Sequence, residues 1–176
     1  QFVLEITRRT EALAARMKEA AGQAQHVVLL TSGDVSVWLY AWPLARDAHM
    51  REVPESCWWV ASAAKGKHLV ARTGPASFSI EASDHGFSHE LFEGLFRAQR
   101  VPFAIESEVA QCGATLRVGD LRDGAPYRLN VRVDRSLDDP TIAMLAWRDG
   151  KIERVMPSEQ KNGLTVPWSP GLTGGF

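Results

Sequence analysis

The chain has 176 residues, of which 45% are hydrophobic and 23% charged, and its 20 basic residues nearly balance 21 acidic ones. This composition excludes intrinsic disorder, which requires few apolar residues and a large net charge. The near-neutral charge also disfavours a protein whose whole surface binds phosphates. No apolar run approaches the roughly 20 residues of a membrane-spanning helix, so we expect no membrane partner.

The first 25 residues predict a long helix. Apolar side chains recur at steps of three and four residues through Ile6, Leu13 and Met17, which places them in one stripe. Charged residues occupy the rest of the circumference, and several alanines favour the helical state. Gly22 is expected to end the helix.

From His26 the hydrophobic period changes from 3.6 to 2, which predicts strands. Val27–Thr31 and Val35–Trp42 flank Ser32-Gly33-Asp34, and we interpret these segments as a hairpin. We expect a second hairpin between residues 58–62 and 68–73. The alternating segment 77–82 is a further expected strand.

A second helix is predicted from Ser88 to Gln99, because Pro102 cannot continue it. Asp123-Gly124 and Asp149-Gly150 predict tight hairpin turns, since these residues tolerate positive φ. The strands expected after this helix are Phe103–Val109, Ala114–Val118, Tyr127–Asp134, Ile142–Trp147 and Ile152–Met156.

The fold class that follows is α+β, with largely antiparallel sheets of about ten strands in hairpins, one long N-terminal helix and one mid-chain helix. We expect one domain over residues 1–156 and an irregular tail rich in Pro and Gly over 157–176. Ala24–Val27 resembles Ala98–Val101 at matching places, which suggests a duplicated unit of one helix and five strands. The unequal hairpin spacings after these points argue against that duplication.

The tryptophans are the most informative residues. They are Trp38, Trp42, Trp58, Trp59, Trp147 and Trp168. Strand alternation in residues 35–42 places Trp38, Tyr40 and Trp42 on one face, opposite a second apolar face. We expect this aromatic face, with Trp58 or Trp59, to bind a partner. The alternative is a central pair of strands that is covered on both sides.

Arginine makes up fifteen of the twenty basic residues, which favours planar, bidentate contacts. The segment 127–134 alternates apolar and polar residues like a half-buried strand. Arg128 and Arg132, with Arg117 on an expected neighbouring strand, are candidates to bind an anion or an RNA backbone. The alternative is a solvated face on which these arginines form cross-strand ion pairs.

Two histidines and two carboxylates occur close together at Asp84, His85, His89 and Glu90. They are compatible with a metal site or an acid–base pair. Ser88 is better explained as a helix N-cap, so we assign neither a metal nor a catalytic residue there.

We expect Cys57 and Cys112 to be free thiols, because a chain of this size folds without disulfides, although their pairing stays open. Free thiols favour a cytoplasmic location. The terminal Gly174-Gly175-Phe176 invites comparison with a ubiquitin-like modifier, but the chain is too long and its last predicted helix lies too far upstream.

The leading hypothesis is a non-catalytic binding domain, without a cofactor, that recognises a protein or peptide partner through the aromatic face or the N-terminal helix. One alternative is a hydrolase-like or metal-assisted enzyme that uses the segment 84–90. A second alternative is RNA or anion binding by the arginine face, and the ubiquitin-like modifier is a third. Oligomeric state is left open.

Overall fold

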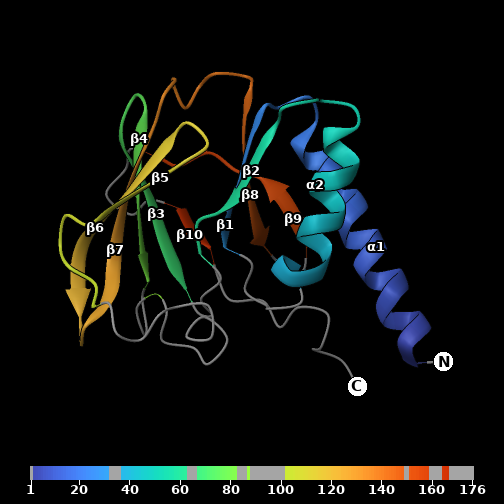
Figure 1. Ribbon diagram of the computed structural model, residues 1–176, viewed down its shortest axis with the longest axis horizontal. Coiled ribbons are helices and arrows are strands. Elements are labelled where there is room, and N and C mark those ends of the chain that lie inside the picture. Colours follow the sequence, from blue (N-terminus) through green and yellow to red (C-terminus); the bar gives the residue numbers. More distant parts are fainter. Residues whose placement is uncertain are drawn as a thin grey trace. The chain divides into compact units, whose positions relative to one another are not determined.

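The computed structural model describes residues 2–31, 37–62, 67–82, 87, 102–148, 151–158 and 164–166. The chain divides into two compact units, each of which is described by itself below. The first unit comprises Gln1–Ala63, Pro140–Val155 and Trp168–Phe176, and the second comprises Ala64–Asp139 and Met156–Pro167. Figure 1 labels the α-helices and strands of both units.

The first unit combines helices with a four-stranded sheet of order β2-β1-β8-β9. Its elements are α1 (Phe2–Ala21), β1 (His26–Thr31), the π-helical turn η1 (Val37–Ala41), α2 (Trp42–Met50), β2 (Cys57–Val60), β8 (Ile142–Arg148) and β9 (Lys151–Arg154). β1 runs parallel to both β2 and β8, whereas β8 and β9 are antiparallel. Parallel neighbours require a long crossover connection, and the segment that contains η1 and α2 provides it between β1 and β2.

The predicted strand over Val35–Trp42 is wrong, because residues 37–42 are helical. Its apolar positions fit a helix as well as a strand. The helical spacing continues from η1 into α2, so the whole segment buries one face as a helix. The buried residues that show this period are Val37, Ala41, Ala45 and His49. Pro43 lies in the first turn of α2, where proline costs no hydrogen bond.

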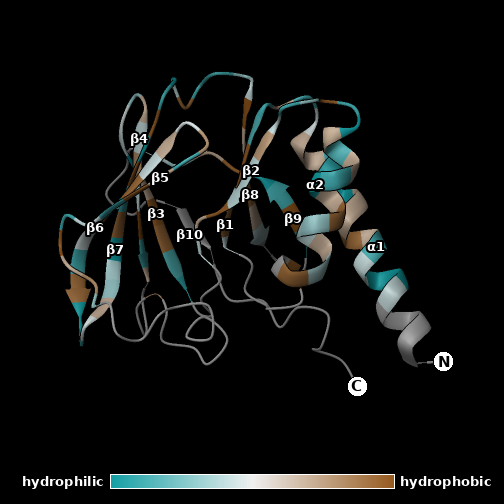
Figure 2. Cartoon of the chain, viewed as in Figure 1, coloured by the Kyte–Doolittle hydropathy of each residue, from teal (hydrophilic) through white to brown (hydrophobic). Residues whose placement is uncertain are grey.

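The predicted N-terminal helix is confirmed as α1. Leu13, Met17 and Ala21 are buried along one stripe, with Met17 fully enclosed. Helix α1 carries hydrophobic and hydrophilic residues in alternating bands (Figure 2). Gly22 ends the helix at a φ of 60°, and its N–H donates to the Lys18 carbonyl at 3.1 Å, as expected for a glycine after the last helical residue.

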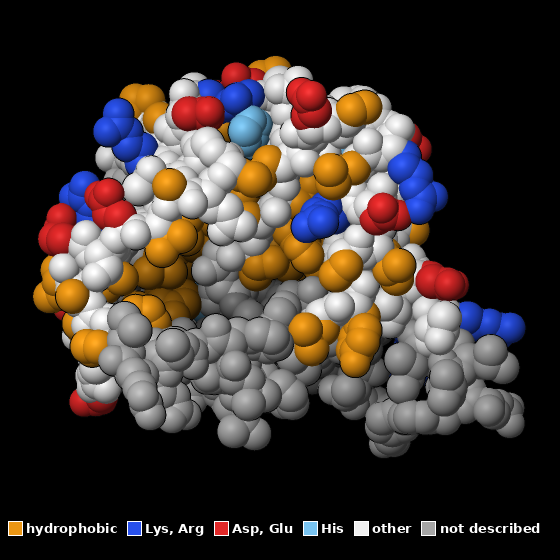
Figure 3. All heavy atoms as spheres, viewed as in Figure 1, with side chains coloured by type: hydrophobic (Ala, Val, Ile, Leu, Met, Phe, Trp, Pro, Cys, Tyr) orange, Lys and Arg blue, Asp and Glu red, His pale blue; other side chains and the backbone are white. Residues whose placement is uncertain are grey.

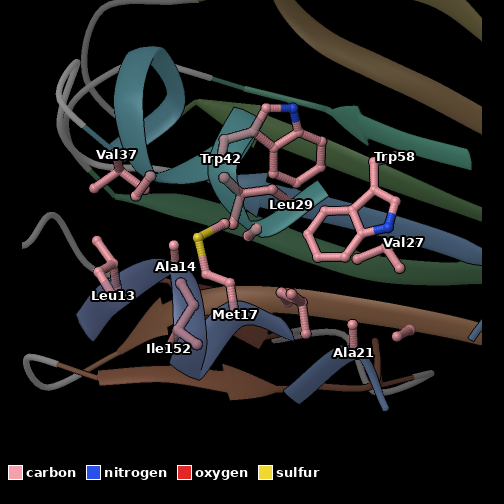
Figure 4. Close-up of a cluster of buried hydrophobic side chains, with 14 of the residues drawn as sticks. Leu13, Ala14, Met17, Ala21, Val27, Leu29, Val37, Trp42, Trp58 and Ile152 are labelled. Carbon is pink, nitrogen blue, oxygen red and sulfur yellow. The ribbon is translucent and has the colours of Figure 1, made fainter. Parts of the chain in front are cut away.

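One face of the four-stranded sheet packs against α1, η1 and α2. Met17 of α1 points into the middle of this cluster, opposite Leu29 of β1 (Figure 4). The indole rings of Trp42 and Trp58 meet edge to face, with centroids 5.0 Å apart. This cluster is the core that holds the helices on the sheet.

The opposite face of the same sheet is also buried. Its members include Val28, Leu30, Trp59 and Met144. Strands buried on both faces read as continuous apolar runs, as expected where strands are parallel. The two-sided coverage that the sequence suggested for residues 35–42 is therefore a property of β1 and β8.

The second unit contains a six-stranded sheet of order β10-β3-β4-β7-β6-β5, in which all neighbours are antiparallel. Its strands are β3 (His68–Gly74), β4 (Ser77–Ala82), β5 (Glu108–Gln111), β6 (Ala114–Arg122), β7 (Ala125–Val133) and β10 (Leu164–Val166). The predicted hairpin between residues 58–62 and 68–73 is wrong, because β2 pairs with β1 and β3 pairs with β4. Part of the segment expected to be an irregular tail forms β10.

The predicted turn at Asp123-Gly124 is confirmed. It joins β6 to β7 with φ values of 52° and 77°, which match the turn that fits the twist of an antiparallel pair. Cys112 and Gly113 repeat this geometry between β5 and β6, with φ values of 50° and 73°. β8 and β9 pair antiparallel across residues 149–150, as the second Asp-Gly dipeptide predicts.

The predicted α+β class is confirmed: the described elements include two α-helices, a six-stranded antiparallel sheet and a four-stranded sheet in which β1 pairs in parallel with two neighbours. Most strand pairings of the described chain are antiparallel, as expected. The expected helix over residues 88–99 and the second copy of the suggested repeat lie outside the described residues. None of the helices that the structure describes is long and apolar enough to cross a membrane.

The expectation of free thiols is wrong, because Cys57 and Cys112 are both disulfide-bonded. Whether the two sulfur atoms oxidise depends on their geometry and on the redox compartment, and not on whether a core of this size needs a disulfide to fold.

Replacing Met17 by alanine should lower the free energy of unfolding of the first unit by about 2–5 kcal/mol, because it leaves a cavity between α1 and the sheet. Urea unfolding followed by tryptophan fluorescence measures this, since the described tryptophans belong to the first unit. Arg16→Ala, on the exposed side of α1, should change the free energy by less than roughly 0.5 kcal/mol. Equal losses in the two variants would contradict the packing of α1.

The cysteines give a second prediction. A thiol reagent added to the unfolded protein, isolated without reductant, should find no reactive thiol, and the two cysteines should react only after reduction. Two reactive thiols per chain before reduction would show that the disulfide-bonded state is incorrect.

Candidate functional site

The structure separates the residues of the expected aromatic face. Trp42, Trp58 and Trp59 are only 8%, 5% and 2% exposed, so their rings belong to the interior of the first unit. Tyr40 in η1 is 61% exposed. Trp38 also lies in η1, and its side chain is outside what the structure describes. Of the described rings, Tyr40 alone faces solvent to a large extent.

The six-stranded sheet of the second unit has one polar face. Strand pairing places Ser77, Arg132 and Thr115 in one cross-strand row on β4, β7 and β6. The next row on the same face contains Asn130 and Arg117. Side chains directly opposite each other on antiparallel strands are close neighbours, so these polar groups form one continuous patch.

This polar patch is hollowed. A hollow of about 550 Å³ lies over it, lined chiefly by polar side chains. The polar lining comprises Thr73, Ser77, Glu108, Thr115, Arg117, Asn130 and Arg132. A second hollow of about 510 Å³ lies beside the Cys112-Gly113 turn and shares Thr115 and Arg132 with the first. Arg132 therefore lines both hollows.

Arg117 and Arg128, two of the three expected anion-binding residues, are already paired with carboxylates. Arg117 donates from Nε to Glu108 at 2.7 Å and from Nη1 to Glu106 at 2.8 Å. These two carboxylates raise the pKa of the Arg117 guanidinium above its ordinary value. Arg128 donates to Glu81 at 2.6 Å across the β4–β7 pair. Both arginines follow the ion-pair alternative that the sequence left open.

Arg132 differs from the other arginines of its unit. Each of those that the structure describes has a partner: Arg72 with Asp138, Arg117 with Glu106 and Glu108, Arg122 over the Tyr127 ring, Arg128 with Glu81, and Arg135 with Asp134. Within the described part of the chain, Arg132 has no ion pair or hydrogen bond. Figure 3 shows the same general pattern, with basic side chains beside acidic ones over much of the surface in view.

Hydroxyl and amide groups surround Arg132. Thr73 donates a hydrogen bond from Oγ1 to Ser77 Oγ at 3.1 Å, beside Arg132 in the same hollow. Asn130 lies over Gly119, where a β-carbon would come within 2.5 Å of the Asn130 amide nitrogen. Glycine at this position therefore leaves space for the amide on the polar face. The hollow thus combines one uncompensated cation with neutral hydrogen-bonding groups.

The described lining of the first hollow contains no histidine or cysteine, and Glu108 is its one carboxylate. Among the residues that the structure describes, no three His, Cys, Asp or Glu side chains gather as metal ligands. The suggested cluster at 84, 85, 89 and 90 lies outside the described residues, as does the terminal Gly-Gly-Phe.

The structure brings Arg117 and Arg132 into one hollow and leaves Arg128 outside its lining. The neutral lining from Thr73, Ser77, Thr115 and Asn130 was not predicted from the sequence. A signal was present, because strand 77–82 places small hydroxyl residues on the face opposite Phe78 and Ile80. Its significance depends on which strand lies next to it, and that information is not local in the sequence.

Comparisons with protein families, curated proteins and solved structures find no match for this chain.

Proposed function

We propose that the chain is a non-catalytic binding domain that recognises a protein or peptide partner through a carboxylate bound by Arg132. The observation that supports this is the position of Arg132, which lines both hollows and has no partner among the described residues. A guanidinium group offers two parallel N–H donors that match the geometry of a carboxylate.

The charge around Arg132 favours a ligand with one anionic group. Arg117 is neutralised by Glu106 and Glu108, and Glu108 itself lines the first hollow. Asp134 lines the second hollow. A chain of phosphates along this face would meet these carboxylates, so RNA is the weaker alternative.

The open shape of the site favours a macromolecular ligand over a small molecule. Small-molecule sites usually enclose most of their ligand, whereas both hollows here lie on the open face of a sheet. An extended peptide could place one acidic side chain at Arg132 and its neighbouring residues in the two hollows. Ser77, Thr115 and Asn130 would supply hydrogen bonds to its backbone.

This proposal places the partner surface on the arginine face. Of the aromatic face that we first expected, Trp42, Trp58 and Trp59 are buried. The state of the cysteines bears on where the domain works, because disulfides persist mainly in oxidising compartments. We therefore infer an oxidising compartment in place of the expected cytoplasm.

Isotope-labelled protein, titrated with a capped alanine pentapeptide that carries a central glutamate, tests the proposal. NMR should show saturable shifts of the Arg132 side-chain N–H and of the Ser77 and Thr115 amides. A peptide with central glutamine should produce no such shifts. Arg132→Gln should weaken binding roughly 10- to 100-fold, because a charge-assisted hydrogen bond is lost.

Arg128→Gln is the matched control, because it removes an arginine from the same strand and face whose charge Glu81 already compensates. It should leave the affinity unchanged. Sodium acetate should bind more weakly than the glutamate peptide, and equal binding would assign the site to small carboxylates. Tighter binding of a single-stranded oligoribonucleotide, with a steep salt dependence, would overturn the peptide assignment in favour of RNA.

A further inference from the structure

A second feature, in the first unit, is independent of the proposed binding site. His49 lies near the end of α2 and is completely buried. Trp58 of β2 donates from Nε1 to His49 Nδ1 at 3.0 Å, and the two ring centroids are 5.0 Å apart. Ser56 Oγ lies 3.1 Å from the same ring nitrogen. His49 thus connects α2 to β2 and to the segment that precedes β2.

These contacts determine the protonation state of the ring. An indole N–H can only donate, so His49 Nδ1 must carry a lone pair. The neutral ring then holds its proton on Nε2, which has no hydrogen-bond partner among the described residues. Adding a proton to Nδ1 would place two N–H groups against each other and break the bond to Trp58.

Few charged groups lie near His49 among the described residues. Lys18 of α1 and Glu52 of the segment after α2 face it, and these two form an ion pair with each other. From β2 and its preceding segment, Trp58 and Ser56 contribute no charge. Burial lowers the pKa of His49 below 6.5, while the Gly22 carbonyl and Glu52 act in the opposite direction to a smaller extent.

We propose that His49 is an acid-sensitive lock, in which proton uptake breaks its bond to Trp58 and releases α2 and residues 51–56 from β2. Ser56 Oγ is the described acceptor that a protonated Nδ1 could use, and Nε2 has no hydrogen-bond partner among the described residues, so the charged ring is more stable after it reaches water. Acidification would then loosen one helix of the first unit while leaving the polar face of the second unit intact.

The direction of the pH dependence follows from proton binding. The released histidine takes up a proton below about pH 6.5, whereas the buried one resists it. The equilibrium constant for release should therefore increase up to about tenfold per pH unit as the pH falls below 6.5. Above that pH, neither state binds the proton, and the constant should be flat.

Amide hydrogen exchange of α2 between pH 7.5 and 5, corrected for the intrinsic pH dependence of exchange, measures this constant. The wild-type protein should show the increase, and His49→Asn should abolish it, because asparagine can accept near the Nδ1 position and does not titrate. His26→Asn, at the partly exposed start of β1, is the matched control and should retain the increase.

An NMR measurement on the unaltered protein keeps the proposal testable if His49→Asn does not fold. The nitrogen shifts of the His49 ring at pH 7.5 should show an unprotonated Nδ1 and a protonated Nε2. A ring that carries its proton on Nδ1 at this pH would overturn the proposal. An equally steep pH dependence of α2 exchange in His49→Asn would also overturn it.

Discussion

The parallel pairing of β1 with both of its neighbours is the constraint on which the first unit depends. Parallel strands cannot be joined by a tight turn, so the chain between β1 and β2 must cross over the sheet. That crossover places η1 and α2 on the sheet, where they bury Trp42 and Trp58. The burial of His49 beside Trp58 follows from the same crossing. The parallel direction of β1 and β2 therefore explains why the tryptophan-rich segment forms part of the core.

The sheet of the second unit differs from that of the first, because it is antiparallel and has one apolar and one polar face. Phe78, Ile80 and Val131 are buried on the apolar face. On the polar face, strand register determines which charges meet, and most arginines lie next to a carboxylate. Exposed pairs of this kind contribute little to stability, typically under about 1 kcal/mol. Their larger effect is that, among the arginines of this face that the structure describes, only Arg132 keeps an uncompensated charge.

The sequence predicted the parts that depend on local chemistry. The helix over residues 2–21, its end at Gly22 and the Asp123-Gly124 turn all rest on periodicity or on backbone preference within a few residues. The segment 35–42 failed because its apolar positions satisfy both periods over so short a length. The strand pairings of β2 and β3 failed because pairing depends on contacts between distant parts of the chain.

The candidate site was predictable only in part, for the same reason. Arg117 and Arg132 were identified as neighbours from strand alternation, and the structure places them in one hollow. The partners that neutralise Arg117 could not be assigned without the register of β5 against β6. The exposure of the aromatic rings likewise depended on the crossover.

The carboxylates beside Arg117 and Arg128 also limit the uncompensated positive charge of the polar face. Loss of Glu81 by mutation would uncover the guanidinium of Arg128 on the same face as Arg132, whereas loss of Glu108 would leave Arg117 paired with Glu106. Two uncompensated guanidinium groups along one strand begin to match the spacing of a charged polymer. Under the proposed function, Glu81 would therefore restrict the ligands of this face, because a single substitution there would add a second uncompensated guanidinium to the described part of the face.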